Sequence, residues 1–385
     1  MYAQRVRRTK EFFMTTVLIS GAGVAGSTLG YWLHRHGLTP TVVEQAAALR
    51  VGGQAIDVRG VALKVVDWLG ILPKVRQART RMRGMSVVDG DGNELMRSTE
   101  TAFSSGRLDS DDVELLREDL TQLLYERTRS DVEYIFGDSI STLTEDENGV
   151  HVEFTHGHPR RFDLVVGADG LHSQVRRLAF GPEEHYLHHL GTYLAVFGLD
   201  NILDLDNWQV WFRDGTTGGV VYPVRDNTQL RVTLGFESEP LEYDYRDTAW
   251  QRQIVADKLA NLRWEIPRLL KAMAEAPDFY FDTMAQIRMD AWTTGRMALI
   301  GDAGYCASTL SGQGTSLALV GAYVLADALR KAGGDHRTAF GCYVARMRPF
   351  VEVNQALVTA NAGGPPSEES MTNAKNAITL DTPSN

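Results

Sequence analysis

Short apolar runs alternate with a helical pattern over the first 45 residues. Thr16–Ser20 is a β-branched run that ends at Gly21, and it predicts a buried parallel strand. Val24–His36 follows with apolar residues at helical spacing, and Thr39–Glu44 predicts a second strand. Together these segments predict a βαβ unit within about 30 residues.

The same buried-strand pattern returns at Leu164–Gly167 and at Met297–Gly301. Further helices and alternating strands are predicted between and after these runs. The helices are Val61–Leu69, Asp119–Arg127 and Thr315–Lys331, and the strands are Val132–Phe136, Ile140–Thr144 and Val150–Thr155.

Residues 185–285 have a different, aromatic-rich pattern of short strands separated by turn residues. The strands are Tyr193–Gly198, Trp208–Phe212, Gly219–Val224 and Leu230–Phe236, followed by one helix over Thr248–Met273. Because buried-strand runs lie on both sides, the sequence predicts an α/β fold. A discontinuous Rossmann-like domain (14–184 and 286–361, with a C-terminal helix) carries an inserted antiparallel sheet domain (185–285). We expect a flexible extension over 1–13 and a disordered tail over 362–385, which is rich in Gly, Pro, Ser and Asn.

Composition narrows the class of protein. Of 385 residues, 43% are hydrophobic, and 39 Lys and Arg against 49 Asp and Glu give a net charge of −10. This acidic balance argues against a broad nucleic-acid-binding face. No apolar run is long enough to span a membrane, and two cysteines exclude a disulfide scaffold.

The N-terminus does not resemble a secretory signal, because its first 13 residues lack an apolar segment. Either Met14 is the natural start or the segment is a short basic arm. We therefore expect a cytoplasmic protein that is a monomer or a homodimer.

The loop Gly21-Ala22-Gly23-Val24-Ala25-Gly26 has the G-x-G-x-x-G pattern between a strand and a helix. In a dinucleotide-binding loop, Gly21 permits the tight turn, Gly23 lets the pyrophosphate approach, and Gly26 allows close helix packing. Glu44, at the end of the second strand, would bind the adenosine ribose. The loop alone does not distinguish FAD from NAD, and a βαβ unit without a ligand stays an alternative.

Two further glycine-containing motifs each follow a predicted buried strand. The first is Gly167-Ala168-Asp169-Gly170, which continues to Ser173 and Arg176. The second is Gly301-Asp302-Ala303-Gly304, followed by Ser311-Gly312-Gln313-Gly314-Thr315 at the start of a helix. With the first loop, this order resembles the class A FAD-dependent monooxygenases, or aromatic hydroxylases, over about residues 15–350. Within this family, the chain resembles relatives of the tetracycline-inactivating and polyketide-tailoring oxygenases.

The resemblance implies which residues contact FAD. Asp302 would accept hydrogen bonds from the ribityl chain. Gly312 and Gly314 would bring the backbone to the flavin ring, where the positive end of the next helix stabilises the reduced flavin. A capping aspartate and a plain helix start are the ordinary structural alternatives.

Four more residues match family positions. Asp169 and Gly170 correspond to a second fingerprint, associated with both FAD and the reductant NADPH or NADH. Arg117, in the segment LLREDL, and Arg59, after a Gly-Gly pair, correspond to arginines near the FAD phosphates or ribityl chain. Turn residues and surface arginines are the alternatives here.

The chain also departs from the family pattern. Relatives often have GDAAH followed by a proline, whereas Gly304-Tyr305 and Ser308-Thr309 stand at the corresponding positions here. The stiffness of this loop is therefore in question.

The resemblance implies the reaction as well. NADPH or NADH reduces FAD, O₂ gives a flavin C4a-hydroperoxide, and its distal oxygen hydroxylates an aromatic, polyketide-like or tetracycline-like antibiotic substrate. No protein nucleophile or metal is implied. A flavin-dependent reductase on the same fold and a non-catalytic flavin- or ligand-binding protein are the alternatives.

Aromatic residues of the inserted sheet are candidates for the substrate pocket. Because alternate strand residues face opposite sides, about half are expected in a core instead. The candidates are Tyr193, Phe197, Trp211, Tyr222 and Phe236, with Arg213 and His188 or His189 as polar contacts.

Overall fold

The computed structural model describes residues 15–383, apart from 105, 245 and 360–366. The predicted extension over 1–13 and the first residues of the predicted tail therefore lie outside the described residues.

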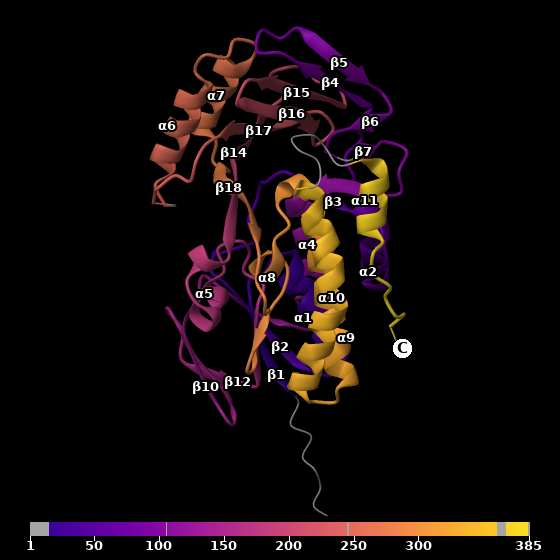
Figure 1. Ribbon diagram of the computed structural model, residues 1–385, viewed down its shortest axis with the longest axis vertical. Coiled ribbons are helices and arrows are strands. Elements are labelled where there is room, and N and C mark those ends of the chain that lie inside the picture. The colour runs from indigo at the N-terminus through magenta and orange to yellow at the C-terminus, as the bar shows by residue number, and fades with distance from the viewer. Residues whose placement is uncertain (1–14, 105, 245, 360–366, 384–385) are drawn as a thin grey trace, which may run out of the picture.

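Within the described residues, six strands form a mostly parallel sheet in the order β19-β20-β13-β1-β2-β9 (Figure 1). Only β19 runs antiparallel to its neighbour. The chain order reverses between β13 and β1, and in open α/β sheets ligands bind where the order reverses, at the carboxyl ends of the strands. The strands are β1 (Thr16–Ser20), β2 (Thr39–Glu44), β9 (Glu133–Phe136), β13 (Leu164–Gly167), β19 (Thr293–Thr294) and β20 (Met297–Leu299).

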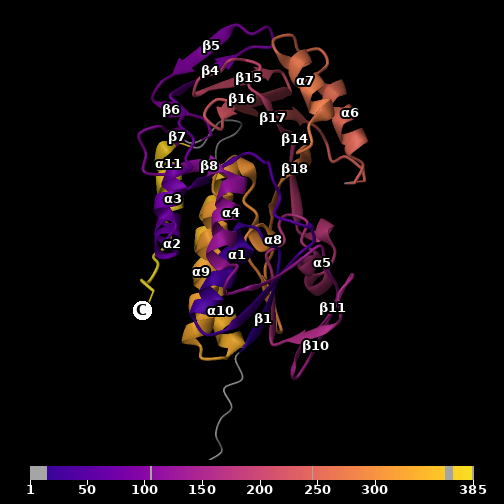
Figure 2. The same ribbon diagram turned by 180° about the vertical axis from the view of Figure 1, so that it is seen from behind.

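Helices cover one side of this sheet, and a small antiparallel sheet with one helix covers the other (Figures 1 and 2). Trp32 is fully buried, and its ring lies 4.9 Å from the ring of Tyr323, which fixes α1 against α9. The helices are α1 (Val24–Arg35), α4 (Arg117–Thr128), α9 (Gly314–Lys331) and α10 (His336–Thr359). The other layer holds β10 (Ile140–Asp146), β11 (Gly149–Phe154), β12 (Arg160–Phe162) and α5 (Gln174–Phe180).

A second sheet lies above the first in Figure 1, in the order β18-β14-β17-β16-β15-β4-β5. The prediction of an inserted antiparallel sheet omitted three of its strands, which are β4, β5 and β18. β4 and β5 come from the first half of the chain, and β4 pairs parallel with β15, with Met85 opposite Gln209. The hairpin joins this sheet because Met85 and Val88 are buried there. The strands are β4 (Gly84–Val88), β5 (Glu94–Ser98), β14 (Leu187–Asp200), β15 (Trp208–Asp214), β16 (Thr217–Val224), β17 (Gln229–Glu237) and β18 (Tyr280–Ile287).

Two helices, α6 (Thr248–Leu259) and α7 (Ile266–Glu275), cover the outer face of this sheet. The sequence predicted one helix over Thr248–Met273, and that prediction is wrong at its centre. Pro267 lies in the first turn of α7, where proline favours a helix start and cannot continue a preceding helix.

Short elements join the two sheets. They are β3 (Ala55–Val58), β8 (Val113–Leu116), β6 (Thr101–Ala102), β7 (Gly106–Arg107), α2 (Ala62–Trp68), α3 (Leu72–Gln77), α8 (Asp302–Tyr305) and the 3₁₀ turns η1 (Glu183–His185) and η2 (Thr309–Ser311). None of the helices in the described parts of the chain combines the length and apolarity needed to cross a bilayer.

The predicted disorder of the C-terminal tail is wrong for residues 367–383, which include α11 (Glu368–Lys375). Ser367 caps this helix through the N–H of Ser370, and Ala374 is fully buried. Lys375 Nζ lies 2.7 Å from Asp112 Oδ2, so an ion pair fixes the helix to the residue that precedes β8. Composition missed the helix because these contacts are made with residues far away in sequence.

Candidate functional site

The three motifs of the sequence meet at the carboxyl ends of adjacent strands. Gly21 follows β1 with φ +103°, and a Cβ there would lie 2.5 Å from the carbonyl oxygen of Ala168, after β13. Ala25 Cβ lies 3.2 Å from the place that a Cβ would take at Gly301, after β20. Residues separated by up to 280 positions thus form one crevice.

The first loop has the shape that a pyrophosphate requires. A Cβ at Gly26 would lie 1.9 Å from the Gly21 carbonyl oxygen, so only glycine allows α1 to approach the loop. At Gly23 the corresponding space is open. α1 begins without a side-chain cap bond and without an acidic residue in its first turn. Its first N–H groups and its positive end are therefore available to an anion.

Glu44 lies at the end of β2, beside this loop. Its Oε2 accepts a hydrogen bond from the N–H of Ala22 at 3.0 Å, and its Oε1 accepts one from the N–H of Ala46 at 2.9 Å. The carboxylate is therefore fixed next to the loop, where a ribose hydroxyl can reach its remaining acceptor positions.

We expect Glu44→Ala to weaken FAD binding about tenfold or more, because a hydrogen bond to a charged group contributes about 1.5–3 kcal/mol. Flavin fluorescence titration measures the change. FMN has no adenosine, so its affinity should stay the same. An unchanged Kd for FAD would remove Glu44 from the site.

Asp302 is an exposed side chain at the first residue of α8. The surrounding protein raises the pKa of its carboxyl, and a hydrogen bond from Cys306 and the charge of Arg117 act against that rise. A Cβ at Gly314 would lie 3.8 Å from Asp302 Oδ1, so the aspartate borders the start of α9. An acceptor in this position suits a hydroxylated chain.

Arg117 is the first residue of α4, and its guanidinium has no hydrogen-bond or ion-pair partner in the described part of the chain. Burial lowers its pKa, while the charges of Asp302 and Glu44 act in the opposite direction. The arginine therefore lies within electrostatic reach of both carboxylates. A half-buried cation without a protein partner suits a phosphate group.

Arg59 and the glycines before α9 complete the crevice. Arg59 Nη2 lies 3.4 Å from the Cβ place at Gly312, which has φ +61°. The N–H of Arg59 donates to Ser316 Oγ, in the first turn of α9, at 3.1 Å. The sequence predicted that Arg59, Gly312 and Gly314 serve one site, and they do lie together.

Asp169 has a structural role in the second motif. One of its oxygens accepts from Ser20 Oγ and from the N–H groups of Gln174 and Val175, and the other accepts from Ser173 Oγ. It therefore joins the end of β1 to the start of α5. Gly170 beside it has φ +81° and open space at its Cβ place. The predicted contact of Asp169 with FAD or nicotinamide stays a prediction.

The departures from the family pattern have local explanations. Tyr305 is buried, and its hydroxyl lies 3.0 Å from that of Tyr343. A Cβ at Gly321 would lie 2.0 Å from the Tyr305 hydroxyl, so this glycine makes room for the tyrosine. Ser308 has φ +73°, which proline cannot adopt. The loop is held instead by Ser311 Oγ, which donates to the Ser308 carbonyl at 2.8 Å.

The pocket prediction is wrong for three aromatic residues. Tyr193, Phe197 and Phe236 lie in the apolar core between the second sheet and the helices α6 and α7. Tyr193 stacks on Phe236 at 5.8 Å and accepts a hydrogen bond from the N–H of Leu241. Arg213 is 67% exposed and pairs with Glu237 at 3.7 Å. These side chains pack the outer face of the sheet or extend into solvent.

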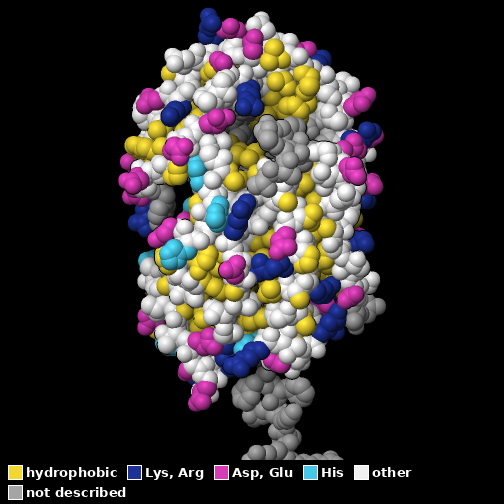
Figure 3. Space-filling view, viewed as in Figure 1, with side chains coloured by type: hydrophobic (Ala, Val, Ile, Leu, Met, Phe, Trp, Pro, Cys, Tyr) yellow, Lys and Arg dark blue, Asp and Glu magenta, His cyan; other side chains and the backbone are white. Residues whose placement is uncertain are grey.

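Trp211 and Tyr222 lie on the opposite face, toward β3 and β8. Tyr222 Oη accepts from the N–H of Ala55 at 2.7 Å. Trp211 Nε1 donates to Gln209 Oε1 at 3.1 Å, and its ring meets that of Phe103 at 5.4 Å. In the space-filling view, a cluster of hydrophobic side chains lies over the upper sheet (Figure 3).

Sequence reasoning missed Gln209 and the segment at Phe103 and Ser104. Gln209 is fully buried, and its Nε2 donates to Ser104 Oγ at 2.7 Å. The amide thereby holds Trp211 and the β6–β7 segment together. A glutamine within an aromatic strand was the available signal, since a buried amide requires partners.

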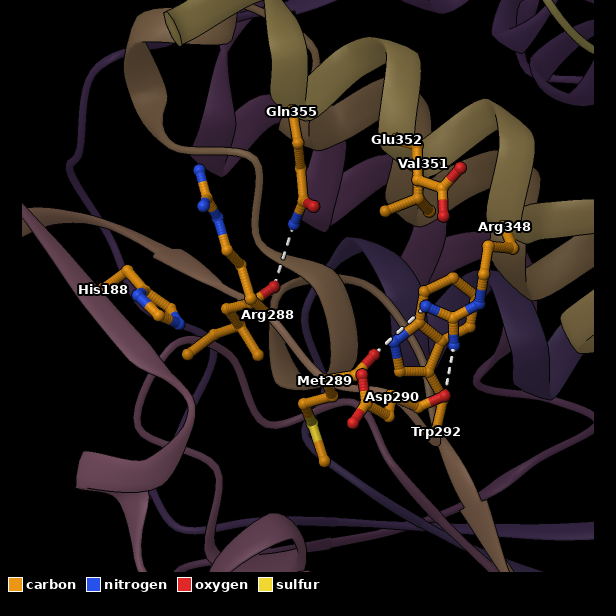
Figure 4. Close-up of a pocket in the computed structure, with 10 residues that line it drawn as sticks. His188, Arg288, Met289, Asp290, Trp292, Arg348, Val351, Glu352 and Gln355 are labelled. Atoms are coloured by element: carbon orange, nitrogen blue, oxygen red, sulfur yellow. Dashed lines mark hydrogen bonds between the residues drawn. The ribbon is translucent and has the colours of Figure 1, made fainter.

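His188 borders a cavity of about 360 Å³ between the segment after β18 and α10 (Figure 4). Figure 4 shows Arg348 and Gln355 pointing from α10 toward that segment. Arg348 donates to the carbonyl groups of Met289 and Asp290, and Gln355 donates to that of Ile287. No predicted FAD-binding residue lines this cavity.

His189, the alternative polar contact, is hydrogen-bonded to Thr283 Oγ1 and to the Ser238 carbonyl.

His172 connects the two sheets. Its Nε2 lies 3.0 Å from Asp282 Oδ1, on β18, and its Nδ1 lies 2.8 Å from Glu183 Oε1, on η1. Burial lowers the pKa of His172, but hydrogen bonds to the two carboxylates outweigh that effect and raise the pKa to about 10. His172 is therefore protonated at neutral pH.

We expect this ion pair to make stability depend on pH. The folded-state pKa lies above the ordinary value of 6.5, so the stabilisation is complete below pH 6.5 and is lost as the pH rises toward 10. The thermal unfolding midpoint of the wild type should therefore fall more steeply over this range than that of His172→Gln. Parallel curves would contradict this role.

The chain matches known families and structures over most of its length. Residues 14–352 match a family model described as an FAD binding domain. An uncharacterised protein of Mycobacterium tuberculosis is 51% identical over 369 residues, which cover 95% of this chain and 99% of that protein. A flavin-dependent monooxygenase of Legionella longbeachae is 41% identical over 341 residues, which cover 88% and 86%.

Two crystal structures share the whole architecture. The tetracycline destructase Tet(51) has a TM-score of 0.86 at 34% identity, and the alignment covers 96% of this chain and 100% of that one. The tetracycline destructase Tet(55) has a TM-score of 0.84 at 37% identity, with coverage of 96% and 99%.

Proposed function

The chain belongs to the FAD-binding family of flavin-dependent monooxygenases, and on that premise we propose that it hydroxylates an aromatic, polyketide-like or tetracycline-like molecule. NADPH or NADH and O₂ would be its co-substrates. The observation that carries the proposal is the convergence of the three motifs below the apolar face that holds Trp211. The likeness to tetracycline destructases supports a large, flat substrate.

The residues of the crevice fit FAD along its whole length. The open loop at Gly23 and the start of α1 would hold the pyrophosphate, and Glu44 would hold the adenosine ribose. Arg117 would neutralise phosphate charge, and Asp302 would bind the ribityl hydroxyls. The residue types thus match the order of groups in the cofactor.

The chain contributes binding, orientation and exclusion of water. When bound, FAD supplies the redox chemistry, which is acceptance of a hydride and activation of O₂ for transfer of one oxygen atom. The start of α9 would place a positive helix end beside the ring, where negative charge would develop on reduction. Trp211 and Phe103 provide an apolar wall that would stack on a substrate ring and exclude water.

The visible spectrum of the purified protein is the first test, and a flavin spectrum is expected. NADPH and NADH oxidation is then measured with and without a panel of phenols and tetracyclines under ¹⁸O₂. Ligand-stimulated oxidation with one labelled oxygen atom in the product would support the proposal. Glu352→Gln, in the cavity of Figure 4, is a matched surface control.

Other outcomes would favour other functions. Oxidation of the nicotinamide with a reduced product and no labelled oxygen would indicate a flavin-dependent reductase. A flavin spectrum without any ligand-stimulated oxidation would indicate a binding protein. A colourless protein that does not take up added FAD would overturn the proposal.

A further inference from the structure

Two buried carboxylates face each other beside the proposed flavin site. Asp57 on β3 and Glu114 on β8 are directly opposite residues of the antiparallel pair. The Asp57 side chain is 10% exposed, and Glu114 is 7% exposed. Like charges opposite each other in a ladder repel, and burial disfavours each charge further.

One arginine serves this carboxylate pair. Arg59 Nη2 lies 2.9 Å from Asp57 Oδ2. Glu114 accepts a hydrogen bond from the Thr80 hydroxyl, and no cation of the described chain lies within ion-pair distance of it. Asp57 Oδ1 has no hydrogen-bond partner among the described residues. Two negative charges therefore share one positive charge.

The other charged and titratable groups around the pair do not correct this imbalance. Asp112, which precedes β8, is neutralised by Lys375 of α11 at 2.7 Å. Tyr222, from the sheet above, accepts the N–H of Ala55. Arg231 lies beyond Tyr222 and is paired with Glu118 and Asp278. A proton is the remaining way to balance the pair.

Protonation of Asp57 near neutral pH agrees with this geometry. Burial is the main cause that raises the pKa of Asp57 to about 7, with Arg59 lowering it and Glu114 and Asp112 raising it further. The ordinary value is 3.8.

Arg59 connects the pair to the proposed flavin site. Its backbone N–H is bonded to Ser316, and its Nη2 donates to the Ser104 carbonyl at 2.6 Å. The same Nη2 lies 3.4 Å from the Cβ place at Gly312. Its Nε has no partner among the described residues. Any change in the net charge around Arg59 therefore changes the electrostatic potential at this glycine.

We propose that Asp57 holds a proton opposite the charge of Glu114, and that this proton sets how much of the Arg59 charge acts on the flavin. The proposal rests on the proposed FAD site. Asp57 is then a positioning residue, which acts through Arg59. When Asp57 is protonated, the uncompensated guanidinium stabilises the anionic reduced flavin and makes the midpoint potential more positive. When Asp57 ionises, it neutralises Arg59 and the potential falls.

The test is a spectroelectrochemical titration of the FAD-bound wild type, Asp57→Asn and Glu114→Gln between pH 5 and 9. The wild type should show an extra inflection near pH 7. Asp57→Asn should lose this inflection. At pH 8.5 its flavin should be reduced about tenfold more favourably than that of the wild type, which makes the midpoint potential about 30 mV more positive for a two-electron couple. Glu114→Gln should move the inflection to lower pH, because the opposing carboxylate is gone.

The apoprotein gives a second readout. Since the pKa of Asp57 is raised on folding, wild-type stability should decline as the pH rises from about 4 to about 7, and Asp57→Asn should lack this decline. If Asp57→Asn does not fold, the inflection of Glu114→Gln decides.

Potentials and pH slopes that are the same in all three proteins would overturn the inference while leaving the FAD site intact. A wild type that binds no FAD would instead overturn the proposed function and, with it, the coupling to flavin. In that case the unfolding curves would still report on the proton of Asp57.

Discussion

Asp302→Ala is expected to abolish most FAD binding without destabilising the apoprotein. Asp302 is exposed at the end of the β20 strand and borders Gly314 and Arg117, so its carboxylate is placed to accept hydrogen bonds from a polyol. One or two such charged bonds at about 1.5–3 kcal/mol each would raise the Kd for FAD by at least about tenfold to a hundredfold. Flavin fluorescence titration measures this change.

The unfolding curve separates this effect from a structural one. Desolvation by the surrounding protein atoms raises the pKa of Asp302, so the ionised carboxyl is disfavoured in the folded apoprotein. Its removal should therefore leave the unfolding midpoint without FAD unchanged or slightly higher. Asp302→Asn keeps one acceptor, so its Kd for FAD should lie between those of the wild type and Asp302→Ala. Asp290→Ala, on the surface, is the matched control. Full retention of FAD by Asp302→Ala would contradict the assignment.

Gly26→Ala and Gly23→Ala are expected to fail in different ways, although both add one methyl group to the same loop. At Gly26 the new Cβ would lie 1.9 Å from the Gly21 carbonyl oxygen and 3.3 Å from Ile19 Cγ2. The start of α1 would have to move away from β1. A loss of about 3 kcal/mol or more in the free energy of unfolding is expected, since such overpacking costs 1–3 kcal/mol even in milder cases.

Gly23 has φ −77°, and no atom lies within 4 Å of its Cβ place, so alanine causes no strain. Gly23→Ala should unfold like the wild type but bind FAD at least about tenfold more weakly, or by about 1.4 kcal/mol, because the methyl group occupies the pyrophosphate approach. Thermal unfolding of the two apoproteins measures the stability difference between Gly26→Ala and Gly23→Ala, and FAD titration measures the difference in affinity. Equal effects of the two changes on stability would contradict the loop geometry.

Local patterns predicted the parts of the site that are set by neighbouring residues. β1, β2 and β13 have the bounds that the sequence predicted, because buried parallel strands are continuous apolar runs. The glycine loops follow them directly, since each special backbone position needs glycine within a few residues of the strand end. Asp302 and Arg117 were instead predicted beside the crevice from the resemblance to the FAD-dependent monooxygenases.

The second sheet shows where such patterns end. The alternation of side chains along a strand predicted that Tyr193 and Tyr222 lie on the faces of the sheet, but not which face meets the first domain. α6 and α7 cover the face that holds Tyr193, and β3 and β8 meet the face that holds Tyr222. Pairing of β4 with β15 joins residues more than 120 positions apart, and no local signal carries it.

The sequence by itself determined the α/β class, the phosphate loop and the residues offered to FAD, because these depend on short-range periodicity and on glycine at particular turns. The tertiary structure alone decided that Trp211 and not Phe236 faces the crevice, that Ser308 adopts a φ angle closed to proline, and that the tail forms α11 against Asp112. It also placed Asp57 opposite Glu114. These features depend on burial and charge between distant segments, which only the folded chain brings into contact.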